Sequence, residues 1–337
     1  MKWRLVAVLL IALAGLPALA EGSAVVFTYH RFGEDRVPAT NIRLAQFEVH
    51  LRILEEGKFT VWPLSRIIRA LRDGTELPDR TVALTADDAY RSVLTEAWPR
   101  LQRRGWPMTL FVATDGVDQG YRGYLNWDEI RGLQDQGMEI GAHSSSHAHM
   151  AEMLAAPAAA DLHRSARRFK QELGQVPTLF AYPYGESGLL MKQVVQQAGY
   201  AAAFGQHSGP VGHGMDLYDL PRFAMNEAYG AADRFQLAAN SLPLRITEPV
   251  PADTLLRTGA LPPFGFRLVS DVRPGGLSCF HSMSKGPVSL VVEGDIVRFR
   301  VDARAVPGRS RYNCTAQAGG GRWYWHGRQF VTPGGTD

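Results

Sequence analysis

Two groups of polar side chains stand directly after apolar runs in this chain. Asp87 and Asp88 end the run at residues 81–86, and His143 and His147 follow a second such run. Adjacent carboxylates repel each other unless a cation or a proton lies between them. One aspartate and two histidines are a typical zinc ligand set that leaves a coordination position open for water. These residues therefore indicate a metal-dependent hydrolytic site.

The elements that must position these groups alternate between strands and helices. Apolar runs predict strands at residues 24–29, 81–86, 108–112, 138–142, 178–182 and 200–204. Apolar residues at helical spacing predict helices at residues 44–54, 63–71, 93–101, 127–136, 161–173 and 189–198. This alternation predicts an α/β fold, a parallel sheet with helices outside it. With about seven strands we expect a closed or nearly closed (β/α) barrel, whose active site lies at the carboxyl ends of the strands.

The C-terminal part has a different pattern. Three prolines at residues 243–251, without a helical period, predict a linker. Beyond it, short strand-like runs separated by glycine-rich turns predict a small all-β domain. The only two cysteines, Cys279 and Cys314, are expected to form a disulfide there if the protein is exported. We therefore expect a barrel domain at residues 24–242 and a β domain at residues 252–337.

An aromatic triplet near the C-terminus allows two interpretations. Trp323, Tyr324 and Trp325 lie among basic residues, which suits stacking on sugar rings. Alternating aromatic residues on a terminal strand also fill the core of a small β domain. We favour the core interpretation.

The N-terminus predicts export. Lys2 and Arg4 precede a short apolar run, and Ala18-Leu19-Ala20 ends it, as in a secretory signal peptide at residues 1–20. No later apolar run is long enough to span a bilayer. Removal of the peptide lowers the formal net charge from +3 by the two basic residues, to +1, which argues against a nucleic-acid partner. We expect a periplasmic or secreted protein without a transmembrane segment after cleavage.

A third polar piece, Tyr182-Pro183-Tyr184-Gly185, follows another predicted strand. Together with Thr85-Ala86-Asp87-Asp88 and the His-Ser-x-x-His piece, in this order, it resembles the polysaccharide deacetylase (NodB-homology) family. The resemblance extends over roughly residues 24–240. It implies a distorted (β/α) barrel, a divalent metal that we expect to be Zn²⁺, and removal of N-acetyl groups from hexosamine units of a cell-wall polysaccharide or exopolysaccharide.

The resemblance also implies roles for individual residues. Asp88, His143 and His147 would hold the metal. Asp87 would be the general base that takes a proton from the attacking water, and the backbone N–H of Tyr184 would help to hold the oxyanion. This chemistry suits an amide, which needs a strong nucleophile and a place for the developing negative charge.

The sequence departs from the family pattern in two ways that concern catalysis. The arginine that the family places two residues before the proline of the third motif is Ala181, and the late Leu-x-His motif that supplies an acid has no clear match. We expect Arg222 to orient Asp87 and His207 to act as the general acid. Two alternatives remain: a non-catalytic polysaccharide-binding protein on this fold, and an O-deacetylase of an acetylated exopolysaccharide.

Overall fold

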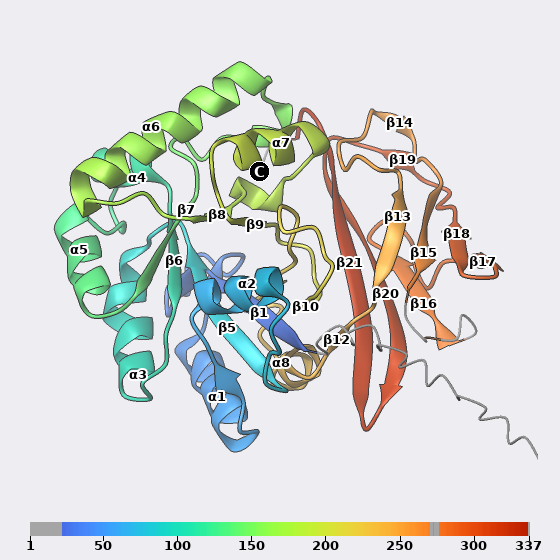
Figure 1. Ribbon diagram of the computed structural model, residues 1–337, viewed down its shortest axis with the longest axis horizontal. Coiled ribbons are helices and arrows are strands. Elements are labelled where there is room, and N and C mark those ends of the chain that lie inside the picture. Colours follow the sequence, from blue (N-terminus) through green and yellow to red (C-terminus); the bar gives the residue numbers. More distant parts are fainter. Residues whose placement is uncertain (1–21, 270–271, 273–275, 336–337) are drawn as a thin grey trace, which may run out of the picture.

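A mainly parallel sheet surrounded by helices forms the N-terminal part of the protein (Figure 1). The structure is a computed structural model that describes residues 22–269, 272 and 276–335. In these residues the sheet runs in the order β10-β1-β5-β6-β7-β8-β9, with β4 beside β5 and β11 beside β1. The strands are β1 (Ser23–Tyr29), β4 (Thr60–Val61), β5 (Thr81–Asp87), β6 (Thr109–Val112), β7 (Glu139–Ala142), β8 (Leu179–Ala181), β9 (Ala202–Phe204), β10 (Val211–Gly212) and β11 (Phe223–Ala224). The pairs from β1 through β9 are parallel and β10 is antiparallel, which confirms the distorted (β/α) barrel.

The helices lie where the apolar periodicity predicted them, except for α4 and α8, which were not predicted. They are α1 (Leu44–Glu56), α2 (Leu64–Asp73), α3 (Trp98–Gln102), α4 (Thr114–Asp118), α5 (Trp127–Asp135), α6 (Ala155–Leu173), α7 (Leu189–Gln197) and α8 (Ala232–Ala239), and a π-helical turn (Val93–Ala97) leads into α3. Asn126 caps α5, because its side chain accepts from the Glu129 backbone N–H. Helix α6 begins six residues before the predicted start, and Pro157 is tolerated because it lies in the first turn.

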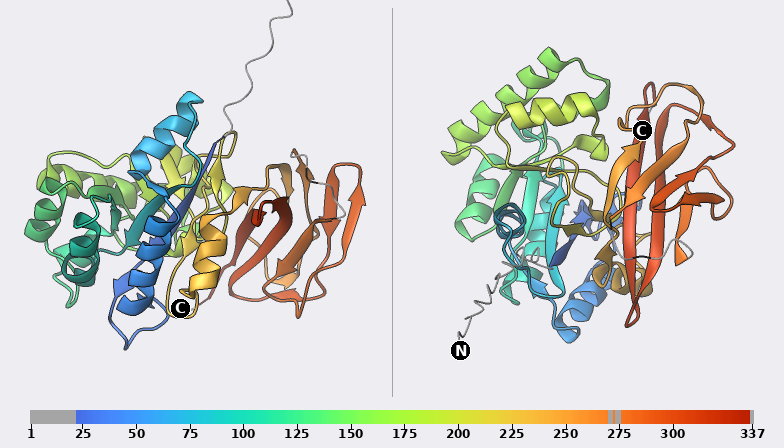
Figure 2. Two further views of the ribbon diagram at one scale, coloured as in Figure 1. Left: turned by 90° about the horizontal axis from the view of Figure 1, so that it is seen from below. Right: turned by 45° about the vertical axis from the view of Figure 1, so that its right-hand side comes forward.

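Two stacked sheets form the C-terminal part (Figure 2). One has the order β12-β21-β20-β16 and the other β13-β15-β18-β17. The strands are β12 (Leu242–Pro243), β13 (Ile246–Val250), β15 (Phe264–Leu268), β16 (Ser278–His281), β17 (Leu290–Glu293), β18 (Ile296–Phe299), β20 (Gly308–Gly319) and β21 (Arg322–Thr332). Short pairs complete the topology, namely β2 (Arg31–Phe32) with β3 (Asn41–Ile42) and β14 (Gly259–Ala260) with β19 (Arg304–Ala305). Phe264, Tyr312 and Phe330 pack together in the shared core, and the predicted disulfide joins Cys279 to the directly opposed Cys314. We call this unit the β-sandwich.

The linker prediction for residues 243–251 was wrong. Pro243 ends β12 and Pro249 lies within β13, so two of the three prolines are strand residues. Both strands lie at the edge of their sheets, where the missing N–H of proline costs no ladder hydrogen bond. The chain therefore passes from the barrel into the β-sandwich through paired strands.

The β-sandwich contacts the barrel through β21, which Figure 1 shows beside it. The Trp325 ring packs edge-on against Phe223 of the barrel at a centroid distance of 5.2 Å. The neighbouring Tyr324 packs instead against the β-sandwich core. Successive residues of a strand point to opposite faces, so β21 belongs to both cores.

None of the helices in the described ranges has the length and apolarity to cross a membrane. The predicted signal peptide at residues 1–20 lies outside the described residues.

Candidate metal centre and active site

The acid pair lies at the carboxyl end of β5, where the chain turns sharply. Asp87 is the last residue of the strand, and Asp88 and Ala89 have φ angles of +74° and +62°. Side chains other than glycine rarely adopt this left-handed conformation, and its presence at two successive residues marks a constrained turn. Both carboxylates are buried, yet they face different partners. The turn therefore separates two adjacent acids into two distinct environments.

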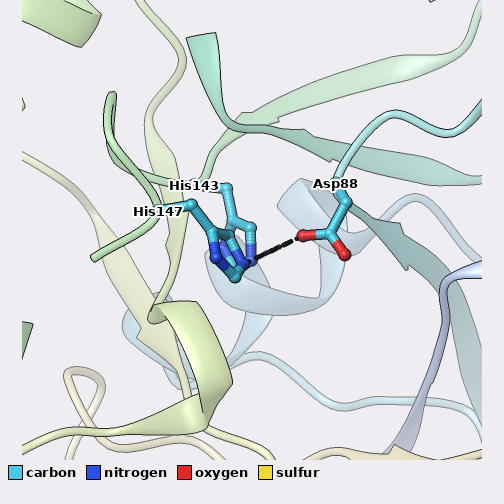
Figure 3. A group of neighbouring side chains, drawn as sticks. All are labelled: Asp88, His143 and His147. Carbon is cyan, nitrogen blue, oxygen red and sulfur yellow. Dashed lines mark ion pairs between the residues drawn. The ribbon is translucent and has the colours of Figure 1, made fainter. Parts of the chain in front are cut away.

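Asp88 faces the two histidines, as Figure 3 shows. One Asp88 carboxylate oxygen, Oδ1, lies 3.1 Å from Nε2 of His147 and 3.4 Å from Nε2 of His143. One ligand atom from each of the three residues lies within 4.8 Å of the other two. Burial alone would raise the pKa of Asp88, but the adjacent imidazoles of His143 and His147 hold this pKa well below its ordinary value. The carboxylate is therefore ionised beside two imidazoles.

The orientation of His143 suits metal binding. Its Nδ1 lies 2.7 Å from the Ala181 carbonyl oxygen, so this nitrogen carries the proton and donates it. The lone pair is left on Nε2, which faces Asp88. Among the described residues, neither His143 Nε2 nor Asp88 Oδ1 has a hydrogen-bond partner, although both atoms are buried. Buried polar atoms without partners are costly, so the pair fits a divalent metal of the kind that carboxylate and imidazole ligands select.

A buried carboxylate holds the loop between the two histidines. Asp161 of α6 accepts hydrogen bonds from the backbone N–H groups of Ser145 and Ser146, at 2.7 and 3.2 Å. The Ser144 hydroxyl accepts from the His147 backbone N–H at 3.0 Å. These bonds stabilise the positive φ angles of Ser144 and His147 and fix the direction of the second imidazole.

Asp87 faces Arg222 rather than the histidines. The two guanidinium Nη atoms donate to the two Asp87 oxygens at 2.7 and 2.8 Å, and both side chains are fully buried. Arg222 also donates to the Gly205 carbonyl and the Thr85 hydroxyl, so the guanidinium itself is fixed. Burial alone would raise the pKa of Asp87, but Arg222 lowers it, so Asp87 is ionised. The contact expected between Arg222 and Asp87 is therefore present.

The third motif forms a tight turn after β8. Tyr184 has a φ angle of +58°, and its ring packs edge-on against the His147 ring at 4.6 Å. The carbonyl groups of Tyr184 and Gly185 both accept from the Gln329 side chain, each at 3.0 Å. Gln329 belongs to β21, so the β-sandwich contacts the turn directly.

The structure does not bring His207 together with the metal ligands. Burial lowers the pKa of His207, and the charges that act on it are Asp219, Arg328 and Arg311. Two of these belong to the β-sandwich. The backbones of His207 and Arg222 are paired, because the His207 carbonyl accepts from the Arg222 backbone N–H. The Arg222 side chain points toward Asp87, whereas the His207 side chain points toward the β-sandwich, away from the proposed metal ligands.

His30 lies at the site instead. It follows β1, and the register that pairs Tyr29 with Ala86 brings it level with Asp87. Burial lowers the pKa of His30, and the opposing effects come first from Asp88 and then from Asp87. In the sequence His30 is a histidine directly after a predicted strand. This position alone does not show whether the side chain lines a site or only caps the strand.

Two residues that hold the site were not predicted. Asp161 and Gln329 lie outside the three motifs and act through hydrogen bonds to backbone groups. An aspartate on a helix and a glutamine on a terminal strand carry no signal of such contacts in the sequence.

The fold is a distorted (β/α) barrel, and Asp88, His143 and His147 form a group that could hold a metal ion. Residues 74–203 match the polysaccharide deacetylase family model. The match confirms, for this segment, the resemblance to the polysaccharide deacetylase family that the motifs indicated.

Curated relatives and solved structures agree with this assignment. A putative polysaccharide deacetylase, YxkH of Bacillus subtilis, is 20% identical over 55% of this chain and 68% of its own length. The poly-β-1,6-N-acetyl-D-glucosamine N-deacetylase of Escherichia coli is 24% identical over 54% of this chain, but the match spans only 33% of that protein. The structure of IcaB from Ammonifex degensii has a TM-score of 0.57 and 24% identity, over 64% of this chain and 98% of that one. Deacetylase PplD of Streptococcus pyogenes has a TM-score of 0.58 and 19% identity, over 63% and 96% of the two chains. At these identities the solved structures support the fold.

Proposed function

We propose that this protein is an exported, metal-dependent hydrolase that removes N-acetyl groups from hexosamine units of a polysaccharide. The observation that carries the proposal is the Asp88–His143–His147 group beside the buried Asp87–Arg222 pair. The names of the E. coli and Staphylococcus aureus relatives, poly-β-1,6-N-acetyl-D-glucosamine N-deacetylases, support the substrate class.

The metal ligands would be Asp88, His143 and His147, with Zn²⁺ as the proposed ion. When bound, such a metal lowers the pKa of water toward about 7 and polarises a carbonyl oxygen. The rest of the chemistry belongs to the protein. Asp87 is ionised and oriented by Arg222, and a carboxylate retains lone pairs beyond those used by two donors. Asp87 is therefore suited to accept the proton of the attacking water.

The Tyr184 turn is suited to stabilise the developing oxyanion. Its positive φ angle and the Gln329 contacts fix the direction of its peptide groups before substrate binds. Preorganised donors of this kind contribute about 3–4 kcal/mol in acyl-transfer enzymes. The Tyr184 backbone N–H is the proposed donor.

The departing amine needs a proton from an acid. His30 is our choice for this role in place of His207, because His30 shares the site with both aspartates and His207 faces the β-sandwich. On this assignment His30→Ala abolishes N-deacetylation and His207→Ala retains it.

Acetate release from N-acetylglucosamine polymers tests the proposal. The protein is treated with a chelator and assayed with and without added Zn²⁺, beside Asp87→Asn, which keeps the shape of the base but removes its charge. We expect zinc to restore activity in the wild-type protein and not in the variant. Acetate from O-acetylated polymers alone would favour the O-deacetylase, and no acetate from any acetylated polymer despite bound metal would favour the binding protein.

A further inference from the structure

A polar cleft of about 330 Å³ lies where the barrel meets the β-sandwich. The barrel contributes His149, Glu152 and Glu186, and the β-sandwich contributes Arg309, Arg311 and Thr332 to its lining. Ligand pockets in proteins measure about 300–1,000 Å³. The cleft is therefore large enough for one small ligand.

The cleft adjoins the candidate active site. The His149 ring stacks on the Tyr184 ring at a centroid distance of 4.2 Å and an interplanar angle of 8°. Tyr184 in turn contacts the His147 ring, so two aromatic side chains connect the cleft to a proposed metal ligand. A chain molecule bound over the metal ligands on this side would reach the cleft with its next unit.

The lining offers both hydrogen-bond donors and acceptors. Arg309 and Arg311 contribute guanidinium groups, and Glu152 and Glu186 contribute carboxylates, so the formal charges of these four cancel. Within the lining, Glu186 already lies 3.8 Å from Arg309 and 2.9 Å from His149. Such a mixture favours a neutral ligand rich in hydroxyl and amide groups over a strongly charged one.

Arg311 is a partly buried cation that lacks a carboxylate partner among the described residues. It is partly buried, and its Nε donates to Gln329 at 2.7 Å. In the part of the chain that the structure describes, no carboxylate forms an ion pair with it, and the nearby Arg309 adds a like charge. A partly desolvated cation without a counter-charge is costly unless other polar groups satisfy it.

We propose that this cleft is a subsite for the hexosamine unit next to the one that is deacetylated, so that the β-sandwich supplies half of the substrate groove. The proposal rests on the proposed function and specifies its substrate as a polymer or an oligosaccharide rather than a single sugar. Arg309 and Arg311 donate to hydroxyl or acetamido oxygens of the neighbouring unit, and Glu152 and Glu186 accept from its hydroxyls.

Kinetics on substrates of two lengths test the subsite. Full-length protein is assayed with N-acetylglucosamine itself and with its hexasaccharide, beside Arg309→Ala and Arg298→Ala. Arg298 is the matched control, because it lies on β18 outside the cleft in an exposed ion pair with Glu293. Loss of one hydrogen bond from a charged group corresponds to about a tenfold change. We expect Arg309→Ala to lower kcat/KM about tenfold on the hexasaccharide, with the monosaccharide and the control unchanged.

A binding measurement separates failure of the subsite from failure of the proposed function. The hexasaccharide is titrated into zinc-loaded Asp87→Asn, with and without Arg309→Ala, and we expect the second substitution to raise Kd about tenfold. If wild-type protein released no acetate, the proposed function would fail, and the titration would still decide the subsite. An equal effect of Arg309→Ala on the monosaccharide and the hexasaccharide, or an unchanged Kd, would overturn the subsite.

Discussion

Among the contacts between single residues, the buried ion pair of Asp87 and Arg222 depends most strongly on its geometry. Removing two charges from water costs several kcal/mol per ion, and the attraction between them repays this only with good geometry and further hydrogen bonds. Here both Asp87 oxygens are engaged, and Arg222 also bonds to Thr85 and Gly205. The pair is therefore sensitive to the loss of either partner.

Arg222→Met should destabilise the protein by about 3–5 kcal/mol and abolish deacetylation. Methionine fills much of the space but leaves Asp87 as a buried, uncompensated charge, which takes up a proton and loses its function as a base. Denaturant unfolding and acetate release measure the two effects.

The matched control is Arg267→Met. Arg267 also donates to both oxygens of one carboxylate, that of Asp295, but the pair is exposed, so its loss should change the free energy of unfolding far less. Equal stability of the two variants would show that the buried pair is not a structural requirement.

Strands and most helices could be predicted from the sequence because the apolar patterns that indicate them lie within a few neighbouring residues. Strands buried on both faces are continuous apolar runs, and the motifs stand at their ends, so β5 and β7 could be found together with the proposed metal ligands that follow them. The linker error arose where proline was taken as a break in the chain, although edge strands tolerate it.

Contacts set by topology could not be derived from local sequence patterns, and the Arg222–Asp87 contact was expected only from a departure from the family pattern. Arg222 reaches Asp87 because β11, which begins at Phe223, pairs in parallel with β1, and β1 pairs with β5. His30 reaches the site through the register of β1 and β5. Nothing within a short window of sequence encodes such pairings, and the choice between His207 and His30 depended on them.

Helix α1 is anchored by a buried histidine. His50 Nε2 donates to the Gly230 carbonyl just before α8, and Nδ1 accepts from the Tyr29 hydroxyl of β1. The imidazole also stacks on Phe235 of α8 at a centroid distance of 4.0 Å. Burial lowers the pKa of His50 from 6.5 to about 4, because a charged imidazole would lose its hydration.

The protein should therefore lose stability as the pH falls from 6.5 to about 4. In this range the unfolded chain binds a proton at His50 that the folded chain does not, and the full effect is roughly 3 kcal/mol. His50→Gln keeps a donor for Gly230 but cannot titrate, so the free energy of unfolding should vary less steeply with pH. His163→Gln, at an exposed site on α6, is the control. Parallel pH profiles for wild-type protein and His50→Gln would contradict this account.

At the scale of the whole molecule, the β-sandwich and the barrel share the active-site wall. Gln329 of β21 donates to two carbonyl groups of the Tyr184 turn and accepts from Arg311, so one side chain connects the proposed subsite to the proposed oxyanion donor. The β-sandwich is thereby more than a separate module carried by the barrel. Its position determines the position of the turn that carries the proposed oxyanion donor.

Gln329→Leu should lower kcat about tenfold, while KM for the disaccharide and the zinc content stay unchanged, because the loss of two hydrogen bonds loosens the turn without removing a metal ligand. Gln329→Glu keeps the shape of the side chain but replaces the donor with an acceptor, so its kcat should fall as well. Gln317→Leu, at an exposed site on β20 near the other end of the β20–β21 hairpin, makes the same chemical change away from the Tyr184 turn and should leave kcat unaltered. A purely structural role for Gln329 would lower thermal stability and leave kcat of the folded fraction intact. A reduced kcat at unchanged metal occupancy would instead show that the β-sandwich positions the turn for the reaction.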